Sequence, residues 1–502
     1  MNLSKSKYCT GIQCPKILWM DKNMPEQKAE QDNSRMLIGN MVGDLAMGYF
    51  GEYTEVSFNH DNLSEMINET IRLLGAGTSI ITEASFVFDG NFCSVDILRK
   101  TDDGYEISEV KSSTGDRNVV PLKINKSYLD DMAYQYYVLT HCGIKIKKVS
   151  LMQLNKEYIR RGELDIRELF VLTDCTDIVI EMQGEVPAHI VDIKTVATME
   201  NEPKSQINNS CIKNDCVYRS WCFRNFPENN IYDIGWSMRG SIKDQAYNCG
   251  YITFEEIFDS PTKLSEHQLL QVKTVVNNLS PHIEPYSIRQ FLSGLTYPLY
   301  HLDFETYQQP IPLWNDVKPY QQIPFQYSLH IQDIACGETS HKEFLGKEGV
   351  DPRRAIAEKL CDDIPDGVCV LAYSAGFEKT QIRGLAELFP DMANHLMRIH
   401  DNIKDLAHPF AKGYYYCREM GGSYSIKHVL PALCSGDPEL DYRNLDLIHN
   451  GGEAMNAFAS LHEKSSEEIK HTRKALLAYC RLDTLAMVKI LERLYEAVAA
   501  VD

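Results

Sequence analysis

The sequence predicts an α/β protein with two domains and a small helical connector between them. At 502 residues the chain is longer than one ordinary hydrophobic core can organise. Strand-like apolar alternation and amphipathic helical patterns occur together in residues 1–230 and again in residues 297–502. Between them, residues 231–296 hold short amphipathic pieces separated by Pro, Gly and Ser, which is typical of a helical spacer.

The first domain is predicted to contain helices, three strands, a further helix and a further strand, in that order. The first helix, residues 34–50, is expected to turn four apolar side chains inward: Leu37, Met41, Leu45 and Met47. A second helix is expected to start at Ser64, its N-cap, and to end at Leu74. The later elements are expected at residues 79–88, in a hairpin that turns at residues 102–104, at residues 126–140 and from residue 143.

The hairpin carries the first candidate site. Asp96 lies in its first strand, and Glu109 and Lys111 lie in its second, where alternate residues share a face. Two carboxylates can bind a divalent cation through hard oxygen ligands, and a nearby ammonium can orient water or stabilise negative charge. A solvated strand face is the alternative interpretation of the same pattern.

A second candidate site begins in residues 297–307, where an apolar strand is expected to end in Asp303 and Glu305. Both carboxylates would lie on one face of that strand, suited to binding metal ions. Further strands are expected at residues 323–334 and 343–346, and then a strand that leads into a helix with Glu378 at its start. The C-terminal helix carries Tyr479 and Asp483. Residues 434–466 are interpreted as an insertion or lid of unassigned role.

Four cysteines stand apart from the rest of the fifteen in the chain. Cys14 lies near the start, and Cys211, Cys216 and Cys222 lie close together among polar residues, which is untypical of small core hydrophobes. A zinc site is one interpretation, although the paired Cys-x2-Cys pattern usual for zinc is missing. Other cysteines lie in apolar contexts, among them Cys93, Cys369 and Cys480.

The charge and composition of the chain exclude some classes of protein. The formal net charge of −19 argues against a protein that coats nucleic acid non-specifically, although local basic stretches follow residue 111 and residue 145. Residues 1–30 lack a signal-peptide core, and no segment is long and apolar enough to span a membrane. With an odd number of cysteines as well, we expect a protein of the reducing cytoplasm without a disulfide scaffold.

At the residues of the hairpin the first domain resembles the PD-(D/E)xK nucleases, specifically the RecB-like branch that includes CRISPR-associated exonucleases. The resemblance implies a restriction-endonuclease-like fold in which Asp96 and Glu109 bind Mg²⁺ or Mn²⁺ and Lys111 serves the attacking water. A glutamine after the strands, here Gln135, contacts substrate or supports the site.

This chain departs from that family's pattern at two places. The early helix of such enzymes often supplies a His or Glu ligand, but residues 39–44 offer only Asp44. The family's Gln-x-x-x-Tyr motif here ends in Leu139.

The same family includes nucleases with an iron–sulfur cluster held by one cysteine near the N-terminus and three clustered after the nuclease core. Cys14, Cys211, Cys216 and Cys222 match that layout, so the resemblance implies a [4Fe–4S] cluster. Cys9 competes for the first position, but Cys14 followed by Pro15 matches the family's pattern better.

The second domain resembles the DnaQ-like 3′–5′ exonucleases of the RNase H-type α/β fold, over roughly residues 297–495. It is similar to an uncharacterised bacterial family often fused to RecB-like nucleases. The resemblance implies that Asp303, Glu305 and Asp483 hold one metal, that Asp303 with Glu378 helps to place another, and that Tyr479 positions water. The second motif departs from the family, since Glu378 stands where Asp is usual.

Together these patterns predict a metal-dependent nuclease with two separate sites, acting as an exonuclease in DNA processing, repair or phage defence. DNA is favoured over RNA as substrate, and protein partners or a homo-oligomer are left open. The alternative is a nucleic-acid-binding effector or sensor subunit, in which one or both sites bind ends without turnover.

Overall fold

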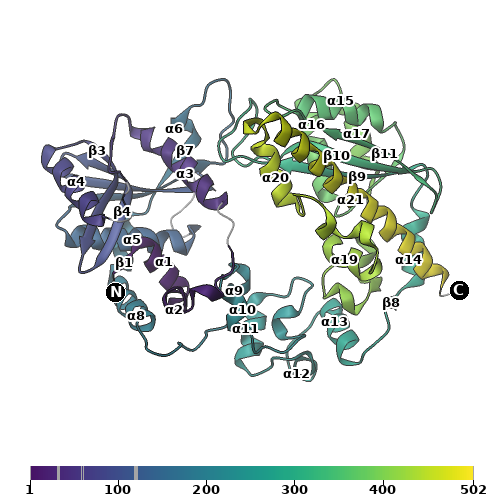
Figure 1. The fold of residues 1–502 in the computed structure, drawn as a ribbon, viewed down its shortest axis with the longest axis horizontal. Coiled ribbons are helices and arrows are strands. Elements are labelled where there is room, and N and C mark those ends of the chain that lie inside the picture. Colours follow the sequence, from purple (N-terminus) through teal and green to yellow (C-terminus); the bar gives the residue numbers. More distant parts are fainter. Residues whose placement is uncertain (1, 31–33, 58, 60–61, 118–122, 501–502) are drawn as a thin grey trace. The chain divides into compact units, whose positions relative to one another are not determined.

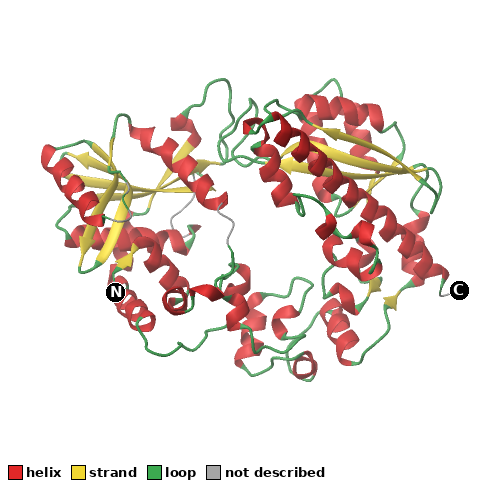
Figure 2. Cartoon of the chain, viewed as in Figure 1, coloured by secondary structure: helices red, strands yellow, loops and turns green. Residues whose placement is uncertain are grey.

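The chain separates into two compact units in the computed structural model, which describes residues 2–30, 34–57, 59, 62–117 and 123–500. The first unit comprises Met1–Asn225 and Gln309–Gln321. The second comprises Phe226–Gln308 and Gln322–Asp502, so the expected connector, residues 231–296, belongs to it. Helices and strands occur in both units, which confirms the α/β class (Figures 1 and 2).

The first unit is built on a mixed seven-stranded sheet of order β2-β3-β4-β5-β6-β7, with β1 paired to β4. Its strands are β1 (Leu3–Ser4), β2 (Thr54–Glu55), β3 (Ile80–Phe88), β4 (Asn91–Thr101), β5 (Gly104–Gly115), β6 (Ile146–Asn155) and β7 (Phe170–Asp174). The expected hairpin is β4 and β5, which pair antiparallel, while β5 and β6 run parallel. A parallel pair needs a crossover connection, and helix α5 lies in the chain between these two strands.

Helices pack on both faces of this sheet. The helices of the first unit are α1 (Lys5–Gln13), α2 (Pro15–Asn23), α3 (Ser34–Met47), α4 (Leu63–Ala76), α5 (Lys126–His141), α6 (Ile166–Leu169), α7 (Thr176–Glu181), α8 (Val186–Ala197), α9 (Ser210–Lys213) and α10 (Arg219–Cys222). The larger hydrophobic core contains buried residues of α1, α4, α5 and α8, and a second core contains those of α3 with β6 and β7. The hairpin is therefore fixed between two packed layers.

Helix α3 presents a different face from the one expected. Leu37 is 64% exposed and Met41 is 41% exposed, whereas Val42 and Ala46, one helical turn apart, are fully buried. The apolar residues of this helix are spread around it, so hydrophobicity alone did not identify the stripe that meets the sheet. Leu45 and Met47 lie against the core as expected.

The start of α4 was also placed wrongly. Asn62 is its N-cap, because the Asn62 side chain accepts a hydrogen bond of 3.3 Å from the backbone N–H of Glu65. Ser64 lies inside the first turn. Asparagine and serine are both strong N-caps, so the two positions compete in the sequence.

The second unit contains a five-stranded sheet of order β11-β10-β9-β12-β13. Its strands are β9 (Leu299–Tyr307), β10 (Ile323–Gln332), β11 (Thr339–Leu345), β12 (Cys369–Ala372) and β13 (Ile403–Asp405). β9, β10 and β11 pair antiparallel, and β12 runs parallel to both β9 and β13. β8 (His282–Ile283) and β14 (Tyr415–Tyr416) form a separate pair.

The remaining helices also belong to the second unit. They are α11 (Gly240–Asn248), α12 (Phe254–Phe258), α13 (Glu266–Val276), α14 (Pro285–Ser293), α15 (Arg353–Asp363), α16 (Gly376–Leu388), α17 (Ala393–Asn402), α18 (His408–Ala411), α19 (Ile426–Leu433), α20 (Gly451–Ala459) and α21 (Ser466–Ala499). The expected helical character of residues 231–296 is confirmed by α11–α14. Among the described residues, no helix is long and apolar enough to cross a membrane.

Candidate active sites

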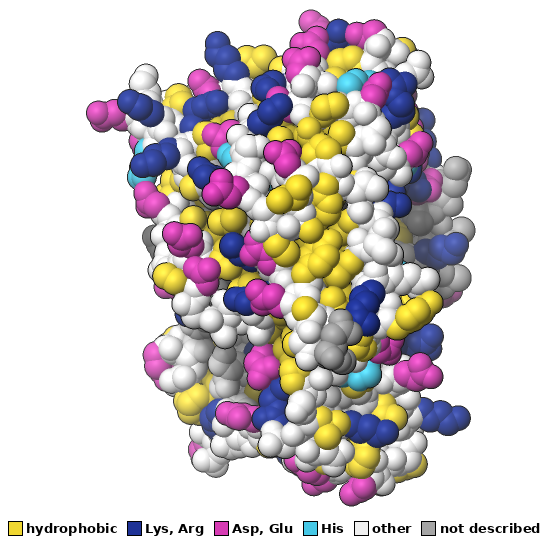
Figure 3. Space-filling model, turned by 90° about the vertical axis from the view of Figure 1, so that its right-hand side faces the viewer, with side chains coloured by type: hydrophobic (Ala, Val, Ile, Leu, Met, Phe, Trp, Pro, Cys, Tyr) yellow, Lys and Arg dark blue, Asp and Glu magenta, His cyan; other side chains and the backbone are white. Residues whose placement is uncertain are grey.

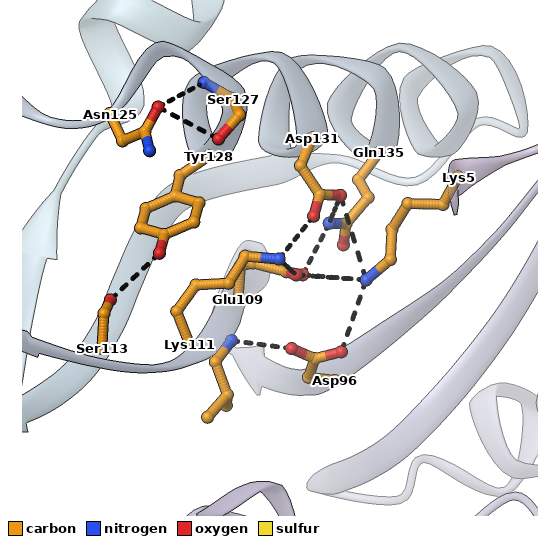
Figure 4. Close-up of polar contacts among 11 residues, drawn as sticks. Lys5, Asp96, Glu109, Lys111, Ser113, Asn125, Ser127, Tyr128, Asp131 and Gln135 are labelled. Carbon is orange, nitrogen blue, oxygen red and sulfur yellow. Dashed lines mark hydrogen bonds and ion pairs between the residues drawn. The ribbon is translucent and has the colours of Figure 1, made fainter. Parts of the chain in front are cut away.

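The first candidate site lies on the central strands of the first unit. Asp96 on β4 and Glu109 on β5 are held side by side by the hairpin, and the backbone N–H of Val110 donates a 2.7 Å hydrogen bond to Asp96 Oδ2. Lys111 Nζ lies 2.6 Å from Glu109 Oε1. Gln135, on α5, donates from Nε2 to Glu109 Oε2 at 2.7 Å. The structure therefore brings together all four residues that the sequence selected (Figure 4).

Two further side chains complete this cluster. Asp131, one helical turn before Gln135, accepts from Lys111 Nζ at 2.7 Å and from Gln135 Nε2 at 3.0 Å. Lys5 reaches Glu109 from α1, with its Nζ 3.1 Å from Glu109 Oε2 and 3.5 Å from Asp96 Oδ1. The i, i+4 spacing to Gln135 could have identified Asp131 in the sequence. No local signal marks Lys5, because the pairing of β1 with β4 brings it there.

Glu83 lies beside the same site on the neighbouring strand. Thr82 and Ala84 pair with Ile97 and Val95, so Glu83 lies in register opposite Asp96. Its φ of +54° is rare for a residue other than glycine, and such strain is often kept at functional positions. Burial raises the pKa of Glu83, and the Lys5 ammonium opposes that shift. Asp44, by contrast, is exposed on α3.

The carboxylates of the first site have pKa values shifted in opposite directions. Burial and the neighbouring Glu109 raise the pKa of Asp96 to about 7. Burial also opposes ionisation of Glu109, but the ammonium groups of Lys5 and Lys111 outweigh it and lower the pKa of that carboxyl. Burial disfavours the Lys5 ammonium, yet Asp131, Asp96 and Glu109 hold its pKa well above the ordinary value. Glu109 is thus a buried carboxylate that stays ionised because cations surround it.

The residues of the first site fit a divalent cation. Oxygens of Asp96 and Glu109 converge on one point, where they already hold a positive charge, the Lys5 ammonium. Within the described part of the chain, the Oε1 atom of Gln135 is buried without a hydrogen-bond partner. Hard carboxylate and amide oxygens are suitable ligands for Mg²⁺ or Mn²⁺.

The second candidate site is centred on β9. Asp303, Glu305 and Cys480 each place a ligand atom within 4.8 Å of the other two. β9 extends from Leu299 to Tyr307, so the two carboxylates lie within the strand and not at its end as expected. Alternate residues of a strand share a face, and this face meets α21, which carries Cys480.

Helix α21 supplies the other predicted residues. Asp483 is buried and accepts hydrogen bonds from the hydroxyls of Tyr442, at 2.6 Å, and Tyr479. Cys480 is fully buried in the core, as its apolar neighbours in the sequence indicated, and its Sγ also lies 3.8 Å from Asp303 Oδ2. In the sequence, Ala, Leu and Tyr neighbours suggested a core position, and only the packing of α21 on β9 revealed the carboxylate.

Glu378 reaches the same cluster from the first turn of α16. The turn before this helix contains Ser374 at a φ of +61°, and the Ser374 N–H donates a 2.9 Å hydrogen bond to Asp405 Oδ1. Glu378 is 3% exposed, and no described residue offers a hydrogen-bond partner to its Oε2 atom. Such an orphaned buried oxygen fits a ligand position for a cation.

Burial raises the pKa of every carboxylate in the second site, and repulsion between its carboxylates adds to the shift for Asp303 and Glu305. Burial, with repulsion from Asp483, Glu305 and Glu378, raises the pKa of Asp303 well above its ordinary value. The pKa of Glu305 rises to about 8 through burial and the nearby Asp483. Burial, with the nearby Asp405, raises the pKa of Glu378 to about 8.

The pKa of Asp483 is raised less than the pKa values of the neighbouring carboxylates. Burial raises its pKa to about 6, and the hydroxyls of Tyr442 and Tyr479 together with Lys427 limit the rise. A group of carboxylates that repel one another without a cation is the donor set expected of a divalent metal site.

Residues 434–466, whose role the sequence left open, contribute to this site. Tyr442 contacts Asp483, and a Cβ atom added at Gly451, the first residue of α20, would lie 3.5 Å from Glu305 Oε2. Tyr442 also lines a cavity of about 740 Å³, whose other walls include Lys427 on α19, Arg443 and His449. Open space with basic side chains therefore lies next to the buried carboxylates.

The four selected cysteines line one small cavity in the first unit. Cys14 precedes α2, Cys211 lies on α9, Cys216 follows α9, and Cys222 ends α10. All four are partly buried, free thiols. Burial raises the pKa of Cys14, while the backbone N–H groups of Lys16 and Ile17 oppose the shift by hydrogen bonding to the sulfur.

The donor set of this cavity suits a metal centre with thiolate ligands. Four cysteine thiols line it, and both tetrahedral zinc and an iron–sulfur cluster take four such ligands.

Comparison with known proteins gives one finding for the second unit. Residues 300–425 match the family described as "Domain of unknown function (DUF2779)". The matched segment includes Asp303, Glu305 and Glu378, and ends before Tyr479 and Asp483. A search of curated proteins found no match to this chain.

Proposed function

We propose that the chain is a metal-dependent nuclease with two separate active sites, one in each unit, that hydrolyses phosphodiester bonds of DNA in preference to RNA. The observation that carries the proposal is the group of Asp303, Glu305 and Cys480, whose ligand atoms lie within 4.8 Å of one another. The buried carboxylates of Asp483 and Glu378, from two further elements, lie close enough to raise the pKa of Asp303. Buried carboxylates that repel one another are costly unless a cation joins them, so the cluster supports metal binding.

The sheet of the second unit supports the same proposal. Three antiparallel strands followed by two parallel strands, in the order β11-β10-β9-β12-β13, agree with an RNase H-like domain of DnaQ type. Its central strand carries Asp303 and Glu305, the positions expected of the first motif. In the first unit, the pairing of β4, β5 and β6 around Asp96 and Glu109 supports a PD-(D/E)xK domain.

Each site would use its own residues to prepare the phosphodiester. A divalent cation, when bound, supplies Lewis-acid stabilisation of the phosphate charge and an activated water. In the first site, the Lys111 ammonium lies on Glu109 and Asp131, where it can orient that water. In the second, the hydroxyl of Tyr479 holds Asp483 and lies where it can direct the water.

The net charge of −19 does not oppose this function. On the face shown in Figure 3, basic and acidic side chains are interspersed around a band of hydrophobic side chains, without one continuous acidic surface. Lys427 lines the cavity beside the second site and could meet a phosphate backbone, whereas Arg443 in the same wall is paired with Asp441.

We propose further that Cys14, Cys211, Cys216 and Cys222 hold a [4Fe–4S] cluster. The cavity that all four cysteines line supports it. Such a group would join the N-terminal helices α1 and α2 to α9 and α10, and so stabilise the end of the first unit.

A nucleic-acid-binding effector without turnover is the second candidate function. The Lys5 ammonium, which lies where Asp96 and Glu109 converge, favours it for the first site, because a site already holding a cation needs no metal. Under this alternative the first unit would bind nucleic acid ends but not cut them.

A cleavage assay distinguishes a nuclease from a binding effector. End-labelled single- and double-stranded DNA and RNA are incubated with the full chain in Mg²⁺ or Mn²⁺, in EDTA, and after metal is restored. The nuclease proposal expects cleavage that EDTA abolishes and metal restores, with DNA cut faster than RNA. Tight binding of ends with no cleavage under any metal condition would favour the effector.

A further inference from the structure

Lys5 occupies the centre of the first candidate site because the start of the chain is built into the sheet. β1 pairs parallel with β4, with Leu3 opposite Asn91 and Ser4 opposite Phe92. The Ser4 hydroxyl then caps α1 by accepting from the N–H of Lys7, so the helix begins at Lys5. Strand pairing and a helix cap together fix the point from which the Lys5 side chain extends.

The Lys5 ammonium binds the oxygens that a divalent cation would need. Its Nζ atom lies 3.2 Å from Glu109 Oε1, 3.1 Å from Glu109 Oε2 and 3.5 Å from Asp96 Oδ1, and Asp131 Oδ1 is 3.9 Å away. Figure 4 shows these contacts meeting at the ammonium from three carboxylates. Asp96 Oδ2 is already hydrogen-bonded to the N–H of Val110, so Oδ1 is the Asp96 oxygen directed at the shared point.

The second lysine of the cluster is placed differently. Lys111 Nζ lies between Glu109 Oε1 and Asp131 Oδ2, at 2.6 Å and 2.7 Å, and no contact to Asp96 is among its described hydrogen bonds. Lys111 can therefore stay in place when a cation joins Asp96 and Glu109. Lys5 cannot, because two cations at the same pair of carboxylates repel each other strongly at such short distance.

We propose that Lys5 is an internal cation that competes with the divalent metal for Asp96 and Glu109. In the metal-free chain the ammonium neutralises the carboxylates and keeps the cluster together. Metal binding displaces it, and since the Lys5 side chain is 20% exposed, the ammonium can swing toward solvent while α1 stays in place. Lys5 thus lowers the metal affinity of this site and is a positioning residue for its carboxylates. The inference rests on the proposed metal site of the first unit.

Mn²⁺ binding tests the competition directly. The full chain carries Asp303→Ala and Glu305→Ala to silence the second site, and Mn²⁺ is titrated while free ion is followed by electron paramagnetic resonance. Lys5→Met should bind Mn²⁺ about tenfold more tightly or better, since a competing charge at contact distance is gone. Lys5→Arg, which keeps the charge, should bind no more tightly than the parent. Lys7→Met, an exposed lysine of the same helix, is the matched control and should change nothing.

Folding is checked by circular dichroism, and Lys5→Gln carries the same test if Lys5→Met does not fold. Mn²⁺ should also raise the melting temperature of the Lys5 variant more than that of the Lys7 variant. Equal or weaker Mn²⁺ affinity in a folded Lys5 variant would overturn the inference, even with cleavage intact. Tighter Mn²⁺ binding without cleavage of any substrate would instead support the inference and refute the nuclease.

Discussion

Tyr442 donates a 2.6 Å hydrogen bond to Oδ1 of Asp483, joining a segment with no expected role to the end of the predicted second site. Asp483 lies on α21, while Tyr442 begins a short 3-10 helix, Tyr442–Asn444, between α19 and α20. The bond fixes the orientation of a buried carboxylate beside Asp303. Residues 434–466 thus help to position a ligand of the candidate metal site.

Removal of this hydroxyl should slow cleavage at the second site without unfolding the chain. A hydrogen bond to a charged group contributes about 1.5–3 kcal/mol, so Tyr442→Phe should reduce the rate by about tenfold or more. The rate at which each variant trims 3′-labelled single strands measures this reduction. Tyr327→Phe is the matched control, because Tyr327 makes a similar 2.7 Å bond to Asp363 outside the site. An equal loss of activity in both variants would assign the effect of Tyr442 to stability.

Shortening the side chain of Glu378 should lower the activity of the second site. Its carboxylate is buried and has an oxygen without a described partner, so Glu378→Asp, one methylene shorter, should withdraw a ligand and lower activity by about tenfold or more. Glu378→Gln should lower it further, since an amide does not replace a carboxylate charge. The readouts are 3′ trimming and Mn²⁺ stoichiometry. An Asp variant as fast as the parent would show that the usual shorter residue serves equally well here.

The metal-free chain should lose stability as the pH rises from 6.5 to 8. The pKa of Glu305 and that of Glu378 are each raised to about 8 in the folded chain, against 4.5 as the ordinary value. The unfolded chain is therefore already ionised where the folded one still holds protons, which costs up to about 1.4 kcal/mol per pH unit for each group. Urea unfolding in EDTA measures this slope, and saturating Mn²⁺ should remove it.

Buried histidines set the lower limit of that pH window. Burial lowers the pKa of His301 to about 4 and that of His330 to about 3. The stability that these two histidines contribute to the folded chain is therefore lost as the pH falls below about 6.5. Above about pH 6.5 the carboxylates determine how the stability of the chain changes with pH. The variant Glu305→Gln with Glu378→Gln is the control and should flatten the slope; a slope unchanged by these substitutions would place its origin elsewhere.

The cysteine cavity should yield a coloured protein. Anaerobically purified chain is expected to be brown, to contain about four irons per chain and to absorb broadly in the visible range. Cys14→Ser, Cys211→Ser, Cys216→Ser or Cys222→Ser should each bleach it and lower the melting temperature of the first unit. Cys249→Ser, at an exposed thiol of the other unit, should do neither. Colourless protein with one zinc per chain would contradict the cluster.

The sequence predicted the parts of each site that lie close together along the chain. Alternation in β5 placed Glu109 and Lys111 on one face, and alternation in β9 did the same for Asp303 and Glu305. The i, i+4 spacing on α21 similarly related Tyr479 to Asp483.

What the sequence missed depends on contacts between distant segments. Lys5 joins the first site through a two-residue strand, and Tyr442 joins the second through a short 3-10 helix. Cys480 is buried, as its apolar chain neighbours suggested, but its contact with Asp303 was not expected, and Leu37, expected to be buried, is exposed. In each case the tertiary packing of a helix or strand, which periodicity does not encode, decided which face meets which partner.

Separation of two activities tests the central claim most directly. Single-stranded DNA labelled at its 3′ or 5′ end is incubated in Mn²⁺ with the parent chain, with Asp303→Ala, with Glu109→Ala and with the double variant, all shown to be folded. The account predicts that Asp303→Ala abolishes stepwise 3′ trimming but keeps a second cleavage pattern, that Glu109→Ala removes only the second pattern, and that the double variant is inactive. A double variant that cleaves as the parent does, or a parent that leaves every strand intact, would contradict it.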